Sequence, residues 1–174
     1  MSIVWVEHIA VPRERVWAAL TSPGVVQPFY FNSLFQADLT PGGALHYSTP
    51  DGKRTFINGR VLYILTGCKL VHEFKFADLS EPAQTVTFEL EETAHGTRVT
   101  IRHEGLDDAP KHRARVKKGW TRILANLKTW LEQGRLPLRT RLEYAAMTLV
   151  IPLMPVPAGA ASQSTPSPHK PEGS

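Results

Sequence analysis

The chain has 174 residues, 42% of them hydrophobic, which suits one domain with a full core and an appendage at most. Its single cysteine, Cys68, excludes an internal disulfide framework and a metal site built from several cysteines. The charged residues behind the net charge of +4 are unevenly distributed along the chain. Residues 1–110 hold nine Lys/Arg and thirteen Asp/Glu, whereas residues 111–141 hold ten Lys/Arg and one Asp/Glu.

The first part of the chain predicts a strand followed by two short helices. Residues 3–11 are rich in β-branched side chains, and Pro12 ends the strand that they predict. Residues 13–20 carry apolar side chains on one side of a short helix. Residues 25–31 are expected to form a second short helix or an irregular turn, interrupted at Pro28.

Six further strands are predicted between turn sequences rich in Gly, Pro and Asp. The expected strands are residues 34–39, 44–49, 54–65, 69–76, 85–92 and 97–104. The last two alternate apolar and polar residues, and His95-Gly96 joins them as a hairpin. Short links between successive strands predict an antiparallel meander, with one face in water and the other in need of a cover.

Residues 110–132 predict a long amphipathic helix that supplies this cover. Its apolar residues recur at the three- and four-residue spacing of one helix face: Val116, Trp120, Ile123, Leu124, Leu127 and Leu131. Gly134 supplies the helix end. The other faces are basic, which is typical of a solvated surface and would also suit an acidic partner.

Six short stretches in this order carry a resemblance to a known family. They are Pro12 with residues 16–21, residues 38–43, Gly59 with Val61, residues 70–74, residues 96–101, and Gly119-Trp120 with Leu124, Leu127 and Leu131. Residues 3–134 resemble the START-like superfamily (SRPBCC, helix-grip or polyketide-cyclase-like). Within it, the chain is most similar to homologues of the activator of the ninety-kilodalton heat-shock-protein ATPase. One departure is Phe29-Tyr30-Phe31, where the family often has Trp in the second short helix.

The resemblance implies an α+β helix-grip fold. In that fold a curved antiparallel sheet wraps around a long C-terminal helix, and two short helices follow the first strand. A hydrophobic cavity is expected between sheet and helix, and strand parity predicts its lining. The expected ligand-binding residues are Leu45, Tyr47, His72, Phe74, Phe88, Val99, Ile101, His103, Trp120, Leu124 and Leu127. Such a lining suits an apolar or amphipathic small molecule, lipids included.

Catalysis is an alternative with three weak candidate residues and no assigned catalytic residue. His72 and His103 could act as acid and base in a cyclase- or aromatase-like reaction, or each could be an ordinary packed histidine. Glu7 shares strand parity with inward residues, so it could lie in an apolar pocket, or reach solvent or pair with an arginine. We expect a binding protein rather than an enzyme. No cofactor and no metal are expected, because the seven histidines lack metal-binding spacing.

A third interpretation is a chaperone-associated protein-interaction module that uses the basic helix face. A protein partner or self-association is therefore also considered. No nucleic acid is expected, because no aromatic residues alternate with the basic ones. The N-terminal sequence lacks the pattern of a secretory signal, so a cytoplasmic location is expected.

We expect three parts along the chain: a START-like domain (1–134), an apolar C-terminal extension (135–157) and a disordered tail (158–174). The apolar residues of the extension, Leu142 among them, are expected to be buried by docking on the domain or on a second copy. Membrane contact through 136–157 is less favoured, because prolines break the run and it falls short of the roughly 20 helical residues of a span.

Overall fold

The computed structural model describes residues 1–77, 82–107 and 109–150, and for 147–150 only the backbone. Its elements in chain order are β1 (Ser2–Ile9), α1 (Arg13–Thr21), β2 (Val25–Gln27), β3 (Ser33–Ala37), β4 (Ala44–Ser48), β5 (Thr55–Leu65), β6 (Lys69–Phe76), β7 (Gln84–Thr93), β8 (Gly96–Glu104), α2 (Pro110–Gln133) and α3 (Leu138–Val150). The protein is therefore α+β, as expected.

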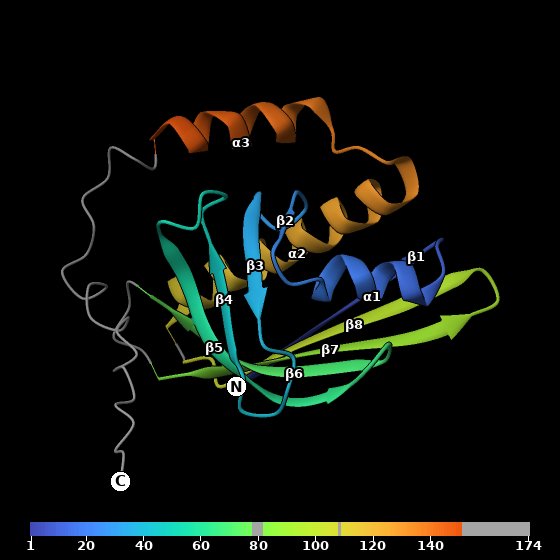
Figure 1. Cartoon of the computed structure of the whole chain (residues 1–174), viewed down its shortest axis with the longest axis horizontal. Helices are drawn as coiled ribbons and strands as arrows, with labels where there is room; N and C mark the ends of the chain where they lie inside the picture. The colour runs from blue at the N-terminus through green and yellow to red at the C-terminus, as the bar shows by residue number, and fades with distance from the viewer. Residues whose placement is uncertain (78–81, 108, 151–174) are drawn as a thin grey trace, which may run out of the picture.

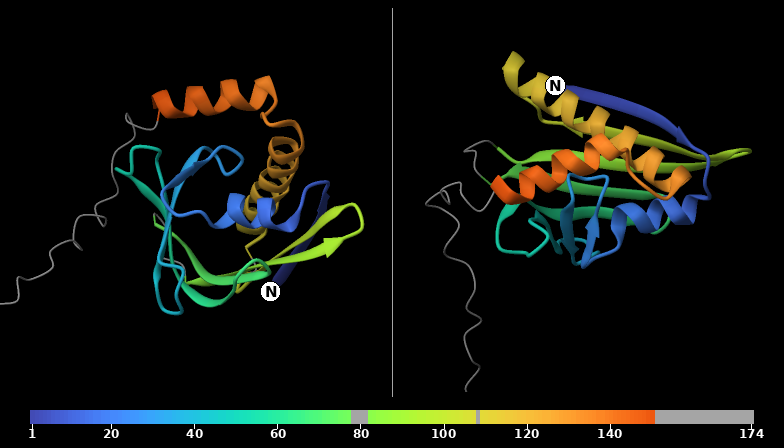
Figure 2. Two further views of the ribbon diagram at one scale, coloured as in Figure 1. Left: turned by 45° about the vertical axis from the view of Figure 1, so that its right-hand side comes forward. Right: turned by 90° about the horizontal axis from the view of Figure 1, so that it is seen from above.

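One antiparallel sheet of eight strands contains every strand described, in the order β1-β8-β7-β6-β5-β4-β3-β2. The meander runs from β2 to β8, and β1 pairs with β8, with Trp5 opposite Ile101 and Glu7 opposite Val99. The sheet is strongly curved, and α1 and α2 lie on its concave side (Figures 1 and 2). This arrangement confirms the curved antiparallel sheet and is consistent with a helix-grip fold.

The expected second short helix is absent from residues 25–31. Residues Val25–Gln27 instead form β2, which pairs with β3 so that Val25 lies opposite Phe35. Two β-branched residues in succession favour an extended backbone, and the pairing with β3 satisfies its hydrogen bonds. The chain then turns at Phe31 and Asn32, whose φ angles are 52° and 55°. Of the two expectations for residues 25–31, the short helix is wrong, whereas residues 28–31 form a turn.

The apolar stripe of α2 is confirmed in full. Its six predicted residues are all buried: Val116, Trp120, Ile123, Leu124, Leu127 and Leu131. Gly134 ends the helix with a φ of 72°, in the left-handed region that a glycine adopts without strain. Trp120 lies at the centre of the core, with its ring 5.8 Å from that of Phe88 and 6.3 Å from that of Phe74. These packed rings join α2 to β6 and β7.

The described part of the C-terminal extension docks on the domain. Helix α3 lies on the side of α2 that faces away from β6–β8 (Figures 1 and 2). Tyr144 is 5% exposed, and its hydroxyl accepts a hydrogen bond from Asn126 Nδ2 at 2.9 Å. Glu143 forms an ion pair with Arg122 of α2. Polar contacts therefore hold α3 at this position.

Leu142 is not buried against the domain, because it is 63% exposed on α3 in the single chain. Leu138, one turn earlier, is 67% exposed. The proposed tail, residues 158–174, and the end of the extension lie outside the described residues. Among the helices that the structure describes, none is long and apolar enough to cross a membrane.

Candidate functional site

The eleven residues expected to line a cavity between sheet and helix are all buried. Aromatic rings pack where that cavity was expected. Tyr30 stacks on Tyr47 with ring centroids 4.3 Å apart, and its edge meets Trp120 at 5.8 Å. Tyr30 belongs to the aromatic run that departs from the family pattern. Two hollows of the described residues lie elsewhere, and none of the eleven residues lines either of them.

His103 is held by hydrogen bonds at both ring nitrogens. Trp120 Nε1 donates to Nδ1 at 2.9 Å, so Nδ1 carries no proton. The Nε2–H group therefore donates to Gln84 Oε1, 2.7 Å away. Burial of the ring, together with nearby His72 and His112, lowers the pKa of His103 to about 3. The ring is neutral and fully engaged, which leaves it no free nitrogen for a substrate.

His72 is also completely buried. Its Nδ1–H group donates to the backbone oxygen of Glu73 at 2.7 Å, and its ring lies 5.6 Å from that of Phe88. Burial lowers the pKa of His72 to about 4, although the bond to Glu73 acts in the opposite direction. Val86 lies between His72 and His103 in the register, so two strand spacings, roughly 10 Å, separate their backbones. The two histidines therefore do not form a hydrogen-bonded acid–base pair.

Glu7, the third weak candidate, lies on the face of β1 that is turned toward α2. There it meets Lys128, whose Nζ lies 3.5 Å from Glu7 Oε1 and 3.2 Å from Glu132 Oε1. The Glu7 side chain is 34% exposed. The structure thus places this carboxylate in a rim ion pair with a lysine rather than in an apolar pocket.

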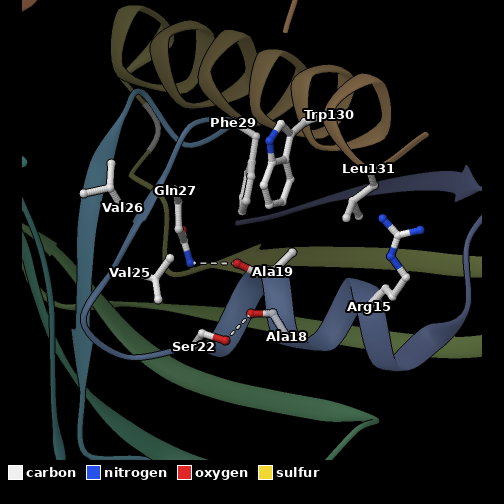
Figure 3. A pocket seen from close by; sticks show the side chains of 10 residues that line it. All are labelled: Arg15, Ala18, Ala19, Ser22, Val25, Val26, Gln27, Phe29, Trp130 and Leu131. Carbon is white, nitrogen blue, oxygen red and sulfur yellow. Dashed lines mark hydrogen bonds between the residues drawn. The ribbon is translucent and has the colours of Figure 1, made fainter. Parts of the chain in front are cut away.

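A hollow of about 310 Å³ lies between α1, β2 and the last turns of α2 (Figure 3). It is lined by Arg15, Ala18, Ala19, Ser22, Val25, Val26, Gln27, Phe29, Trp130 and Leu131. Phe29 and Trp130 form one wall, with ring centroids 5.5 Å apart. This volume falls within the range of small-molecule sites, and the mostly apolar lining is typical of them. We call it the α1–α2 hollow.

Gln27 is the buried polar residue of the α1–α2 hollow, with 2% of its surface exposed. Its Nε2 donates to the backbone oxygens of Ala19 and Leu20, each at 3.1 Å, at the C-terminal end of α1. Figure 3 shows the bond to Ala19. Its Oε1 is buried and has no hydrogen-bond partner among the described residues. An unpaired buried acceptor of this kind costs roughly 1–3 kcal/mol.

Sequence reasoning missed this hollow. Trp130 and Phe29 lie far apart in the sequence, and Trp130 is off the apolar stripe of α2. Gln27 was assigned to a short helix or turn, where its side chain would have no reason to reach the end of α1. The sequence did contain one signal for the hollow, because Phe29 and Trp130 are aromatic residues that the predicted core left without a partner.

The first half of α2 carries five basic side chains: Lys111, Arg113, Arg115, Lys117 and Lys118. We call them the basic half of α2. The ion pairs of the described residues include none of the five, whereas Arg122 and Lys128 further along the helix are both paired. Arg115 instead lies over the ring of Phe76, 4.9 Å from its centroid.

Within the described ranges, no group of three His, Cys, Asp or Glu side chains is arranged to hold a metal ion. The polar side-chain groups of the α1–α2 hollow are an amide, a hydroxyl, a guanidinium and the indole N–H of Trp130. This set can bind a ligand through hydrogen bonds and charge, but it offers no nucleophile paired with a base.

The family model for activator of Hsp90 ATPase homolog 1-like protein matches residues 10–132. A solved structure of an Hsp90 activator from Plasmodium falciparum is 28% identical, with a TM-score of 0.63, over 75% of this chain and 96% of that chain. No curated protein sequence matches the chain.

Two other solved structures show the fold alone, because their sequence identity is low. A protein from Mesorhizobium loti is 24% identical, with a TM-score of 0.62, over 78% of this chain and 100% of that chain. The Aha1 dimer from Colwellia psychrerythraea is 16% identical, with a TM-score of 0.65, over 78% of this chain and 98% of that chain.

Proposed function

The chain belongs to the activator of Hsp90 ATPase homolog 1-like family, and on that basis we propose that its domain, residues 1–134, is a binding module for a small apolar or amphipathic molecule. The α1–α2 hollow is the proposed site. The single observation that carries the proposal is a hollow of about 310 Å³ with mostly apolar walls, one of them formed by the rings of Phe29 and Trp130. A bound molecule would cover this aromatic wall.

The size of the hollow supports a ligand with about the bulk of one or two fused rings. A volume of about 310 Å³ is near the lower end of the range of small-molecule sites. Burying the apolar part of such a ligand against Phe29, Trp130 and Leu131 contributes roughly 25 cal/mol for each Å² removed from water.

The proposal assigns no reaction to the buried histidines. A general base must reach the proton that it removes, directly or through one water. His103 uses both ring nitrogens within the core, and His72 is shielded from solvent. The cyclase-like alternative would therefore require the core to open.

Binding of a neutral fluorescent probe, phenylnaphthylamine, tests the proposal. Ala19→Leu adds bulk on the floor of the hollow, and Ala114→Leu makes the same change at an exposed position of α2. We expect near one-to-one binding to the native chain and to Ala114→Leu, and binding at least tenfold weaker to Ala19→Leu. Equal binding to all three proteins would contradict the proposed site. Native mass spectrometry of protein from its own host would then identify the natural ligand.

A second candidate function is binding of a protein partner at the basic half of α2. Its five cations lack acidic partners among the described residues, and Lys111 and Arg113 lie in the first turn, at the positive end of the helix dipole, where basic side chains are unfavourable. An acidic protein surface would relieve this repulsion. Such a complex should weaken as salt rises, and Lys117→Glu with Lys118→Glu should abolish it. A complex that is indifferent to both changes would exclude this surface.

A further inference from the structure

Strand β1 lies at one end of the sheet, beside α2 (Figure 2). It pairs with β8 along one edge, and none of the described strands pairs with its second edge, which we call the free edge of β1. β1 has eight residues, and proteins usually blunt so long an edge, because its unpaired N–H and C=O groups can pair with another chain. The surroundings of these groups therefore decide whether β1 can accept a further strand.

The free edge carries the backbone groups of every second residue, because these groups point alternately to the two edges of a strand. Those of Ile9 point to β8, since a Cβ on Gly96 of β8 would lie 2.2 Å from the Ile9 oxygen. The even-numbered residues of β1 therefore turn their N–H and C=O groups to the free edge: Ser2, Val4, Val6 and His8.

Side chains of the protein itself close the C-terminal part of the free edge. The carboxylate of Glu7 accepts a hydrogen bond from the His8 N–H group at 3.0 Å, and Lys128 of α2 donates to the His8 oxygen. Just beyond the strand, the N–H group of Ala10 donates to Glu132 Oε1 at 2.8 Å. These contacts stop an added strand before it reaches His8.

The N-terminal part of the free edge, residues 2–6, is open. Among the residues that the structure describes, no group bonds to the edge-facing N–H and C=O groups of Val4 and Val6. The two side chains are 44% and 60% exposed, on the face of β1 opposite Trp5. Their β-branched shape favours an extended backbone and packs well against a neighbouring strand. The open part therefore offers about 16 Å of unpaired strand, at roughly 3.3 Å for each residue.

Helix α2 runs beside β1 in the same direction. The rings of Trp5 and Trp120 lie 6.3 Å apart, and Lys128 reaches the backbone of His8 further along both elements. The part of α2 that precedes Trp120 therefore lies beside the open part of the free edge.

The face of α2 that borders the free edge is positively charged in this part. Lys128 identifies the face, and Lys117 comes eleven residues earlier, about three turns of 3.6 residues, so it lies on the same side of the helix. Arg113 lies one turn before Lys117, and its Nε atom is buried without a hydrogen-bond partner among the described residues. Two neighbouring cations at this spacing repel each other. Carboxylates beside the free edge would pair with both.

We propose that the open part of the free edge binds an extended acidic segment of a partner protein, which joins the sheet as a ninth strand. Main-chain hydrogen bonds to Val4 and Val6 hold the segment, as in other cases of strand addition. Its side chains alternate between the two faces of the sheet. Those on the concave side are carboxylates beside Arg113 and Lys117, and those on the convex side are β-branched and pack beside the two valines.

This binding surface is separate from the α1–α2 hollow and goes beyond the proposed function. It shares Lys117 with the second candidate function, but it differs from it in requiring the backbone of β1. Substitutions on β1 that leave α2 unchanged therefore distinguish the two.

Charge favours an acidic partner over a second copy of the chain. Antiparallel pairing of two β1 strands would place both α2 helices on one face of the joined sheet, where their cations repel. Residues 151–174 of the chain itself also fit poorly, because prolines recur among them and Glu172 is their only acid.

A short peptide tests the pairing with the full chain. Acetyl-Glu-Val-Glu-Val-Glu-amide has the length and the alternation that the open part requires, and acetyl-Lys-Val-Lys-Val-Lys-amide is its charge-reversed control. In NMR titrations we expect the acidic peptide to bind about tenfold more tightly than the basic one at low salt. At saturation, hydrogen exchange of the Val4 and Val6 amides should slow about tenfold, while that of the His8 amide, already bonded to Glu7, changes little.

A proline substitution tests the backbone contact. Val4→Pro removes one edge-facing N–H group and keeps the bonds to β8, and edge strands accept proline at such positions. Val4→Thr is the control, because it keeps the N–H group and a β-branched side chain. We expect the acidic peptide to bind Val4→Pro about tenfold more weakly than Val4→Thr. Exchange protection of the β7–β8 amides checks that both variants are folded.

Two matched pairs of substitutions on α2 test the charge without altering β1. Arg113→Gln with Lys117→Gln removes the two cations beside the free edge. Lys111→Gln with Lys118→Gln removes two cations that lie roughly 90° further round the helix from Lys128. The first pair should weaken binding of the acidic peptide about tenfold at low salt, and the second pair much less.

Three results would overturn the proposal. The first is equal binding of the acidic peptide to Val4→Pro and Val4→Thr, which would place the peptide on the basic half of α2 if both charge pairs also weaken it equally. The second is the lack of any chemical-shift change with the acidic peptide. The third is protection of the Val4 and Val6 amides in the chain alone together with a dimeric mass by light scattering, which would identify a second copy on the edge. The α1–α2 hollow is tested separately, by phenylnaphthylamine binding.

Discussion

Trp120 of α2 donates a hydrogen bond from its indole Nε1 to Nδ1 of His103 on β8, at 2.9 Å. The other ring nitrogen of His103, Nε2, donates a hydrogen bond to Oε1 of Gln84 on β7. The long helix is thus joined to two strands by a buried polar chain as well as by apolar packing. This chain of hydrogen bonds fixes the tautomer of His103. It also makes the stability of the core sensitive to substitutions that keep the core volume but remove a hydrogen-bond donor.

Trp120→Phe should destabilise the protein by about 1–3 kcal/mol, because it leaves His103 Nδ1 buried without a donor. Trp120→Ala should cost more, about 3–5 kcal/mol, since it also opens a cavity. Urea unfolding of both variants measures these losses. Trp5→Phe, at a half-buried ring beside Trp120, is the control and should cost less than Trp120→Phe. Equal midpoints for the two Trp→Phe variants would show that the hydrogen bond contributes nothing.

Stability should fall as the pH drops below about 6.5. The folded-state pKa values of His72 and His103 are lowered to about 4 and about 3, whereas unfolded histidine titrates near 6.5. The unfolded chain therefore binds more protons in this range. The contribution of the two neutral histidines to stability is fully present above about pH 6.5, and it is lost as the pH falls toward their folded-state pKa values. The loss between pH 7 and pH 5 should be roughly 2 kcal/mol for each histidine.

Urea midpoints measured between pH 7 and pH 5 test this dependence, in a range above the titration of most carboxylates. His72→Gln, which cannot take up the proton, should flatten the profile by about half. A native profile that is already flat, or a stability that rises toward pH 5, would contradict the burial of two neutral histidines.

Two glycines provide a paired test of the backbone. A Cβ on Gly59 of β5 would lie 1.9 Å from the backbone oxygen of Glu73, which cannot move without disturbing the pairing of β5 with β6. Gly59→Ala should therefore destabilise the protein by about 3 kcal/mol or more. Gly119→Ala meets nothing within 4 Å and lies inside α2, so it should stabilise by about 0.5–1 kcal/mol. Thermal unfolding of both variants checks the two signs, and a neutral Gly59→Ala would show that β5 and β6 are further apart.

Features that repeat along the chain could be predicted from the sequence. The stripe of α2 and the β7–β8 hairpin each depend on a local period, and both are found where the period placed them. Features that depend on contacts between residues far apart in the sequence could not be predicted in this way. Glu7 meets Lys128 across the fold, and Tyr30 enters the space expected for a ligand, because the chain bends at Phe31 and Asn32. The site is predicted least well, because Gln27 reaches α1 from β2, a strand that the sequence did not predict.

Helix α3 should detach when Tyr144 is lost. The Tyr144 ring lies 6.0 Å from that of Phe31, and its hydroxyl accepts the Asn126 hydrogen bond, so this one residue joins α3 to two parts of the domain. Tyr144→Ala should raise hydrogen exchange of the α3 amides at least tenfold while the β7–β8 amides stay protected. Tyr144→Phe keeps the ring and removes the hydroxyl that accepts from Asn126, and it should have a smaller effect of the same kind. Leu142→Ala, at a residue that is 63% exposed, should leave exchange unchanged. If Leu142→Ala loosens α3 as much as Tyr144→Ala does, then the outer side of the helix is covered in solution, and a second copy or a membrane surface becomes the explanation to pursue.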